Sequence, residues 1–534
     1  MKRKISILAL SALLMFGVSG CSDWLDLRPN SQIILDEFWQ SEQDVESVLA
    51  SCYRGLTEDA VVYRMIVWGE LRSDNMVPGS GFPNERRDMD RILQGDILST
   101  NAYANWGAFY SVINYCNTLI HYAPDVVNRD DNFTQGDLNR VLAEARAIRA
   151  LSYFYLVRAF KEVPWVEEPS IDDTKDYTQA KNTERFLIDK IIEDLLEARK
   201  YARTDFGRVE YNKGRITLNT VNAILADVYL WDGQYQNCVD ACDLVMADKN
   251  LKLVNSDFYY TRVFYNGNST ESIFELQFSE NVQKNNPVFE LYGSSGVISG
   301  EVSFPATLAY NPEETDLTKS TGSYSPFNYK VSTTVIESAK DQRAKDSYNV
   351  SLASTGKYYI FKYAGMSRTE TAIGGDPKSS YRYRVTTPNW IIYRLSDLML
   401  MKAEALVQLE GEANNKQAIE LVNHTYLRSN ESDSIKLVNY QSKNELEKLV
   451  LRERQRELLF EGKRWFDLVR MARREKSTSM LNQFVESKAT GTTNSLGAPV
   501  LDAMYMPISR SEIEANKKLE QNPYYAETGS SSER

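Results

Sequence analysis

Apolar residues recur at intervals of three and four through much of the chain, which is the spacing of one face of an α-helix. In the first half this pattern predicts helices over 37–56, 109–120, 138–160, 186–196, 217–231 and 234–246. In the second half it predicts helices over 391–409, 414–426 and 444–473. The fold class is therefore predicted to be mainly α.

Two of these predicted helix pairs resemble tetratricopeptide units. The first joins 217–231 to 234–246, and the second joins 391–409 to 414–426 through Gly411. The first pair has the residue types that tetratricopeptide units carry at four positions. Ala226 is the small packing residue, Tyr229 the packing ring, Gly233 the turn glycine and Tyr235 the ring of the next helix. Each pair alone leaves an apolar face uncovered, so we expect the pairs to stack into a scaffold.

The region 251–388 has a different composition. Ser, Thr, Asn, Gly and Tyr dominate it, with short β-like runs at 272–278 and 357–363 and no long helical pattern. Loops carried on a rigid scaffold often hold binding residues. We therefore expect an N-terminal helical part over 21–250 and a C-terminal part over 251–534 that contains a loop-rich insert at 251–388.

The N-terminus predicts export. Lys2, Arg3 and Lys4 precede an almost wholly apolar run over 5–18, and small residues lead to Cys21. This is the layout of a signal peptide, here 1–20. A Cys after small residues resembles a bacterial lipobox, which implies cleavage before Cys21 and acylation of its thiol and new amino group. The alternative is an ordinary signal peptide with a chance Cys. No other stretch is apolar enough to span a bilayer, so we expect a lipid anchor to the membrane.

Composition narrows the function classes. The 534 residues include 62 Lys+Arg and 73 Asp+Glu, a net charge of −11, and no basic tract, so a nucleic acid is not an expected partner. Two histidines are too few for a His-rich metal centre. The 32 Tyr, 20 Phe and 8 Trp are enough to supply rings to a surface as well as to a core.

Catalytic and metal signatures are absent from the sequence. It contains no H-E-x-x-H, G-x-S-x-G or P-loop motif, so no catalytic residue, cofactor or metal is predicted. Residues 130–136 loosely resemble a calcium loop, but the pattern favours a turn and helix cap. Of the remaining cysteines, Cys238 and Cys242 are four apart on one predicted helix. They are interpreted as buried small hydrophobic residues, with a disulfide or a metal-binding pair as the alternative.

Four stretches resemble, in order, the hallmarks of one known family. They are AEARAIRALSYF (143–154) with Val163-Pro164, YRLSDLMLMKAEA (393–405), RERQRELLFEGKRWFDLVR (452–470), and a closing motif from MPI (506–508) to QNP (521–523). With the lipobox, the chain resembles the SusD/RagB family of nutrient-binding outer-membrane lipoproteins of Bacteroidetes.

The resemblance implies a function as well as a fold. Such proteins are tetratricopeptide-like lipoproteins on the cell surface that capture a glycan and deliver it to a SusC-like TonB-dependent transporter, without enzymatic activity. The alternatives are a peptide-binding or purely scaffolding subunit of the same complex. A lipid-anchored hydrolase is a third hypothesis, supported by no local signature.

Charges of alternating sign fill the third hallmark. Glu453 with Arg456, and Arg454 with Glu457, are spaced to meet on a helix. Because apolar rings lie on the same segment, we interpret these charges as partly buried structural ion pairs rather than a binding site.

Candidate ligand residues follow from the chemistry of sugars, which present flat C–H faces to rings and hydroxyls to polar side chains. Rings in irregular segments beside amides fit this better than rings at helix spacing, although any single ring can be packing. Two regions contain such rings beside polar side chains. The resemblance to the family favours the first of them, because family ligand residues often cluster before the helix predicted over 109–120. The first region holds Arg72, Asp74, Asn75, Tyr103, Asn105 and Trp106, and the second, over 286–330, holds Phe289, Tyr292, Tyr310, Tyr324, Phe327 and Tyr329. Trp390 is expected in the core.

Overall fold

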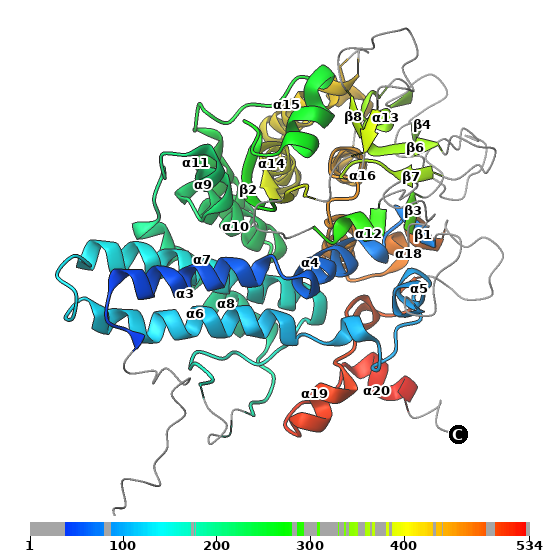
Figure 1. Ribbon diagram of the computed structural model, residues 1–534. Helices are drawn as coiled ribbons and strands as arrows, with labels where there is room; N and C mark the ends of the chain where they lie inside the picture. Colours follow the sequence, from blue (N-terminus) through cyan, green and yellow to red (C-terminus); the bar gives the residue numbers. More distant parts are fainter. Residues whose placement is uncertain are drawn as a thin grey trace, which may run out of the picture.

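The fold, given by a computed structural model, is mainly α-helical, as predicted (Figure 1). The N-terminal segment with Cys21, and the rings of Tyr310, Tyr324 and Phe327, lie outside the described residues. The structure describes residues 38–529 except 79–86, 172–175, 177, 280–285, 293–306, 310–328, 331–335, 338–340, 351–357, 364–365, 369–380, 384–386, 431–433, 441 and 487–496.

Four long helices lie side by side at one end of the molecule (Figure 1). They are α3 (Glu42–Leu56), α6 (Gly107–Val126), α7 (Gln135–Phe160) and α8 (Glu184–Tyr201). Helix α7 begins with a capping box, in which the Thr134 hydroxyl accepts the Asp137 N–H and the Asp137 carboxylate accepts the Thr134 N–H. This confirms the turn-and-cap interpretation of residues 130–136.

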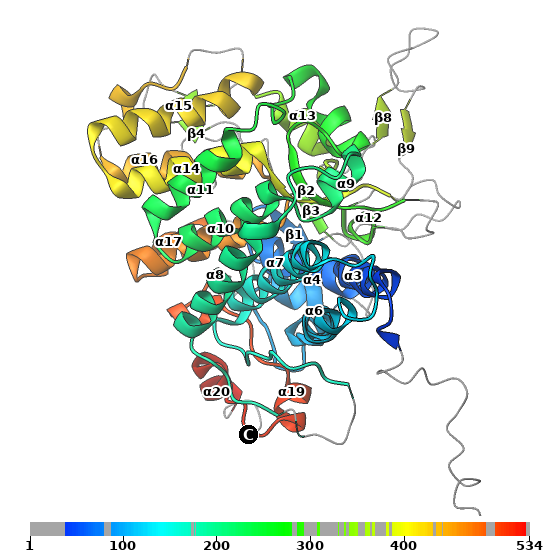
Figure 2. The same cartoon turned by 90° about the vertical axis from the view of Figure 1, so that its left-hand side faces the viewer.

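The two helix pairs are present and they stack (Figure 2). They are α10 (Leu218–Trp231) with α11 (Tyr235–Met246), and α14 (Leu395–Leu409) with α15 (Glu412–Ser429). Each pair turns at a glycine in the left-handed region, Gly233 at φ 77° and Gly411 at φ 93°. Helix α11 packs against α14, and α16 (Lys443–Glu457) packs against α14 and α15, so the apolar faces cover one another.

One helix prediction was wrong at its start. Residues 391–394 belong to strand β10 (Trp390–Arg394), which pairs antiparallel with β2 (Ser272–Leu276), and α14 begins only at Leu395. All five residues of β10 are buried, as expected for Trp390. A short, continuously apolar run carries no alternation, so hydrophobic periodicity cannot separate a buried strand from a helix.

A second prediction, one long helix over 444–473, was also wrong. Helix α16 ends at Glu457 and α17 (Arg464–Glu475) begins after a turn. In that turn Phe460 and Gly462 have φ of 66° and 71°, which a right-handed helix cannot accommodate. The turn gains a tertiary partner, because the Glu70 carboxylate of η2 (Val67–Leu71) accepts the backbone N–H of Phe460 at 3.3 Å and of Lys463 at 3.2 Å.

The remaining elements are short. The helices are α4 (Asp59–Ile66), α5 (Arg87–Leu93), η4 (Ala102–Ala104), α9 (Val209–Gly214), η5 (Ser256–Phe258), η6 (Tyr259–Asn266), α12 (Val288–Tyr292), α13 (Arg343–Ser347), η9 (Leu437–Asn439), α18 (Ser479–Glu486), η10 (Leu501–Met504), α19 (Arg510–Ala515) and α20 (Pro523–Gly529). The strands, which form two-stranded ladders, are β1 (Met76–Pro78) with β3 (Thr307–Ala309), β4 (Tyr329–Lys330) with β5 (Ile336–Glu337), β6 (Tyr348–Val350) with β7 (Tyr358–Ile360), and β8 (Met366–Arg368) with β9 (Tyr381–Tyr383). Strands β2 and β7 confirm the two β-like runs.

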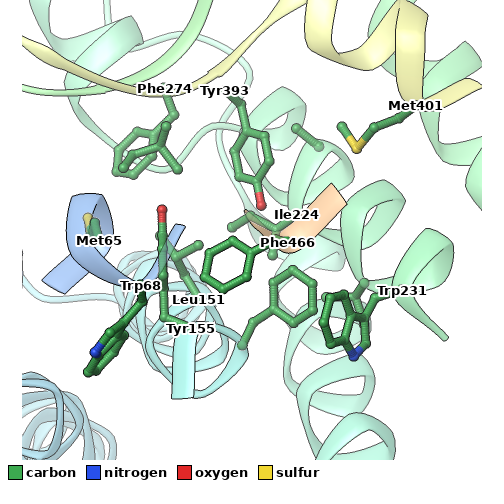
Figure 3. Close-up of a cluster of buried hydrophobic side chains, with 14 of the residues drawn as sticks. Met65, Trp68, Leu151, Tyr155, Ile224, Trp231, Phe274, Tyr393, Met401 and Phe466 are labelled. Atoms are coloured by element: carbon green, nitrogen blue, oxygen red, sulfur yellow. The ribbon is translucent and has the colours of Figure 1, made fainter. Parts of the chain in front are cut away.

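The hydrophobic core is continuous across both halves of the sequence. Figure 3 shows Tyr155 of α7, Trp231 of α10, Tyr393 of β10 and Phe466 of α17 gathered in one cluster. The buried Tyr393 hydroxyl is satisfied by the Asp227 carboxylate at 2.9 Å. The N-terminal helices and the C-terminal part therefore pack as one body.

Buried charges attach the loop-rich region to this body. Arg343 of α13 donates to Glu453 at 2.8 Å and Glu457 at 2.7 Å, and Arg394 donates to Glu457 at 2.5 Å and Glu461 at 2.8 Å. All five side chains are at most 2 % exposed. Removing one partner would leave a buried charge uncompensated, so the cluster fixes the position of α13 on α16.

The predicted structural ion pairs are confirmed in kind, but one partner was wrong. Arg456 donates to Glu453 at 2.8 Å, as the spacing indicated. Arg454 instead meets Asp397 at 3.0 Å and Asp467 at 2.9 Å. Glu457 is taken by arginines from other elements, which a local spacing rule cannot anticipate.

The four cysteines in the described part of the chain, Cys52, Cys116, Cys238 and Cys242, are buried free thiols. Burial raises the pKa of the Cys116 and Cys238 thiols well above their usual value. Within the described residues, no helix combines the length and apolarity needed to cross a bilayer, and no three His, Cys, Asp or Glu side chains group together as a metal site would require.

Candidate functional site

Three polar residues of the first predicted region, Arg72, Asp74 and Asn75, are buried and bound to protein partners. The Arg72 guanidinium donates to the backbone carbonyls of Ala503 and Met504, both at 2.8 Å. The Asp74 carboxylate receives two hydrogen bonds from Arg464, at 2.7 and 2.8 Å. Arg72 and Asp74 are 5 % and 6 % exposed, so they offer a sugar very little surface. Both are therefore corrected to structural residues.

Asn75 has the same structural role. Its amide donates to Glu70 at 2.7 Å and accepts from Gln455 at 2.8 Å, and it is 4 % exposed. The next residue begins β1, which pairs antiparallel with β3 from Met76 opposite Ala309 to Pro78 opposite Thr307. The structure thus joins the first predicted region to the second through a strand ladder, while burying the polar residues that precede it.

The second region is described only in part. Tyr292, at the end of α12, is fully buried, and its hydroxyl donates to the Phe460 carbonyl at 3.2 Å, so it too is corrected to a core residue. Phe289 lies on α12 and Tyr329 on β4, and their side chains are outside the description. Tyr324 and Phe327 are outside the described residues and stay predictions.

The remaining residues of the first region lie just before α6: Tyr103 in η4, then Asn105, and Trp106 as the N-cap residue of α6. Asn105 is half-buried: its side-chain oxygen accepts the Gly107 N–H at 2.9 Å, and its amide donates to Glu512 of α19 at 2.8 Å. Tyr103 is half-buried beside the Arg64 guanidinium, 5.9 Å from its ring centre. This end of α6 is therefore tied to the C-terminal segment, far away in the sequence.

A small pocket opens beside this contact, between α6, residues 164–170 with Gln179, and the chain around α19. We call it the α6 pocket. Its volume is about 220 Å³, below the roughly 300–1,000 Å³ of sites for drug-sized ligands. It is lined by Trp106, Tyr110, Ile113, Asn114, Asn117, Pro164, Val166, Ser170, Gln179, Glu512, Asn516 and Leu519.

The two rings of the α6 pocket are largely structural. Trp106 is 3 % exposed and packs edge-on against Phe160 at 5.2 Å and Tyr110 at 5.9 Å between ring centres. The Tyr110 hydroxyl donates to the Pro164 carbonyl at 2.5 Å. Trp106 therefore offers the pocket little ring surface, and its predicted role as a stacking platform is corrected to that of a core residue at the pocket wall.

The amides of the pocket mostly hold its walls together. Asn114 exchanges two hydrogen bonds with the backbone of Ser170, at 2.7 and 3.2 Å. The Asn516 amide donates to the Gln179 carbonyl at 2.7 Å. The Gln179 side chain itself is exposed, so it can bond to a ligand.

Glu512 is the charged group of the α6 pocket. It is half-buried, and burial raises the pKa of its carboxyl, opposed by hydrogen bonds from the Trp106 indole and the Asn105 amide. Both donors are neutral, and no Lys or Arg is among the described residues that line the pocket. In the sequence, Glu512 and Asn516 belong to the closing motif, and no local pattern predicts that they lie beside α6.

A larger pocket, of about 720 Å³, lies among α9, α10, α11 and the segment 247–273. It contains amides, hydroxyls and the charged groups Asp205, Lys213 and Asp248, but no aromatic ring among the described residues that line it. Of the two pockets, the α6 pocket is the one with aromatic residues, amides and an acid in its described lining.

The sequence matches two family profiles. The profile described as "SusD family" matches residues 259–525, and that described as "Starch-binding associating with outer membrane" matches residues 23–230. The chain is 26% identical to the SusD-like protein P38 of Formosa agariphila, over 98% of this chain and 99% of that protein. It is 25% identical to a SusD-like protein of Bacteroides ovatus, over 91% and 85% of the two chains.

Solved structures share the fold. NanU of B. fragilis matches with a TM-score of 0.68 and 20% identity, over 93% of this chain and 100% of that one. A laminarin-binding SusD-like protein matches with a TM-score of 0.65 and 21% identity, over 91% and 100%. From the profile that spans half of its length, and from the fold it shares with these structures, the chain belongs to the SusD/RagB family.

Proposed function

We propose that this protein is a cell-surface lipoprotein that binds an oligosaccharide or polysaccharide and delivers it to a SusC-like TonB-dependent transporter of the outer membrane. The acylated Cys21 anchors it, and the glycan is bound without any change of covalent bond. Support comes from the family, from the signal and lipobox pattern of the N-terminus, and from a relative of the same fold whose name states laminarin binding.

One observation carries the glycan part of this proposal. The α6 pocket brings an aromatic edge, an exposed amide at Gln179 and a carboxylate at Glu512 together from three distant stretches of the chain. Hydroxyl groups both donate and accept, so an acid that accepts and an amide that does both suit a sugar. The rings Tyr324 and Phe327 are the second candidate contact.

The test is native affinity electrophoresis of the full chain in non-ionic detergent, through gels that contain one polysaccharide each. The pocket variant is Gln179→Ala/Glu512→Ala, and the loop variant is Tyr324→Ala/Phe327→Ala. The matched control, Gln236→Ala/Glu514→Ala, makes the same two changes at exposed positions that do not line the pocket. Trp106→Ala is unsuitable because the ring is core, so its loss would cost stability.

We expect one glycan to retard the wild type and the control equally. The pocket variant should bind it about 10-fold or more weakly, since a hydrogen bond to a charged group contributes roughly 1.5–3 kcal/mol. Retardation lost only in the loop variant would place the glycan on the loops. Retardation by no glycan, with a transporter complex still recovered from the membrane, would favour the peptide-binding or scaffolding alternative.

A further inference from the structure

The described lining of the α6 pocket holds one acidic side chain, that of Glu512, and no Lys or Arg side chain. The whole chain is also acidic, with a net charge of −11. A ligand in the pocket therefore meets the carboxyl group of Glu512, with no basic side chain beside it in the described lining.

Three basic side chains of neighbouring segments, those of Arg149, Lys518 and Arg64, are bound to other groups. Arg149, behind the pocket wall, is bound to Asp194 at 2.8 Å. Lys518 faces Asp176 at 3.7 Å, and its ammonium donates to a backbone carbonyl at 2.8 Å. The Arg64 guanidinium donates its hydrogen bonds to backbone carbonyls, including that of Asn105 at 2.6 Å. No one of these side chains lines the pocket, so none provides an anion-binding group inside it.

The carboxylate of Glu512 discriminates between ligand groups. An ionised carboxylate only accepts hydrogen bonds, so it can bind a hydroxyl but not a deprotonated carboxylate or a sulfate ester, which have no hydrogen to donate. An anionic group about 4 Å away would also be repelled. At a half-buried site that repulsion weakens binding on the order of 10-fold or more.

We propose that the α6 pocket takes one uncharged sugar unit and rejects units that carry a carboxylate or sulfate. This rests on the proposed function, and it narrows the substrate class to neutral glycans. The volume of about 220 Å³ suits a single small sugar unit, so the pocket would bind one unit of a longer glycan chain.

The test compares matched neutral and anionic probes on the full chain by affinity electrophoresis. The neutral probes are laminarin, galactan and xylan, and the anionic ones are the same preparations after carboxymethylation. Glu512→Gln keeps an acceptor for the Asn105 amide but removes the charge. Glu514→Gln removes the same charge from an exposed position of the same helix and serves as the control.

The wild type and Glu514→Gln should be retarded by a neutral probe and at least about 10-fold less by its carboxymethylated form. In Glu512→Gln, the ratio of retardation by the neutral probe to retardation by its carboxymethylated form should fall to about 3-fold or less. Equal or stronger retardation by the anionic form, or an unchanged ratio in Glu512→Gln, would overturn the inference and leave glycan binding intact. Retardation by no probe, neutral or anionic, would overturn the proposed function and this inference together.

Discussion

Among the glycines that the structure describes, Gly69 is the one where an added methyl group would meet the closest neighbouring atom. It lies in η2, against the turn between α16 and α17. A Cβ atom at residue 69 would stand 1.8 Å from the Gly462 carbonyl oxygen and 3.1 Å from the Phe466 ring. The obstacle is backbone rather than a flexible side chain, so the change Gly69→Ala cannot be relieved by a rotamer.

The magnitude follows from this geometry. Real Cβ contacts are rarely closer than 3.0 Å, so the turn must move away by about 1.2 Å, the difference from 1.8 Å. Overpacking of this kind costs about 1–3 kcal/mol, and the displaced turn would also weaken the two hydrogen bonds that Glu70 accepts, by about 1 kcal/mol each. Alanine gains about 1 kcal/mol in helix propensity. The net loss of unfolding free energy should be about 2–4 kcal/mol.

The assay is differential scanning calorimetry with Gly136→Ala as the matched control. A Cβ at Gly136, in the first turn of α7, meets its nearest atoms at 3.5 Å, an ordinary contact. At about 2.1 cal/mol/K of unfolding entropy per residue, a chain of this size loses about 1 °C of Tm per kcal/mol. Gly69→Ala should melt about 2–4 °C below wild type, and Gly136→Ala at or slightly above it. A Gly69→Ala protein that is folded and melts with the control would refute the close contact between η2 and the turn.

Three further predictions concern charge and capping. Burial raises the pKa of Glu70 to about 7, above its usual value near 4.5. The folded state therefore holds the proton of Glu70 more tightly than the unfolded state, so its contribution to the free energy of unfolding is complete below pH 4.5 and falls by about 3 kcal/mol as the pH rises to 7. The variant Glu70→Gln should lose this pH dependence, which urea midpoints measured from pH 5 to 8 would show. Arg394→Met removes the cation that pairs with three buried glutamates, so it should lower the free energy of unfolding by about 3–5 kcal/mol in the same assay. The control Arg54→Met removes an exposed arginine and should change the urea midpoint little. Equal effects of the two changes would contradict the burial argument. Thr134→Ala should lose about 1 kcal/mol with the cap of α7, and an unchanged midpoint would mean that the cap contributes nothing.

The sequence predicted the candidate site less well than the fold. Polar residues in an irregular segment looked like ligand contacts, but Arg72 and Asp74 are the buried partners of the Ala503 carbonyl and Arg464. Nothing local distinguishes a polar residue that faces solvent from one that faces a distant partner. Glu512 was missed for the same reason, since its position beside Asn105 depends on how the C-terminal segment returns to α6.

The sequence by itself determined the structural features that depend on residues close together along the chain. Helical periodicity, the capping residues before α7, and the glycine turns of the two helix pairs are local, so they could be predicted from spacing alone. Tertiary structure decided the rest. Whether 390–394 is a strand depended on β2, the break after Glu457 depended on Glu70 from η2, and the accessible surface depended on which polar groups were already satisfied. The physical reason is that burial and hydrogen-bond partnership are properties of pairs of distant segments, and only the folded chain brings those segments together.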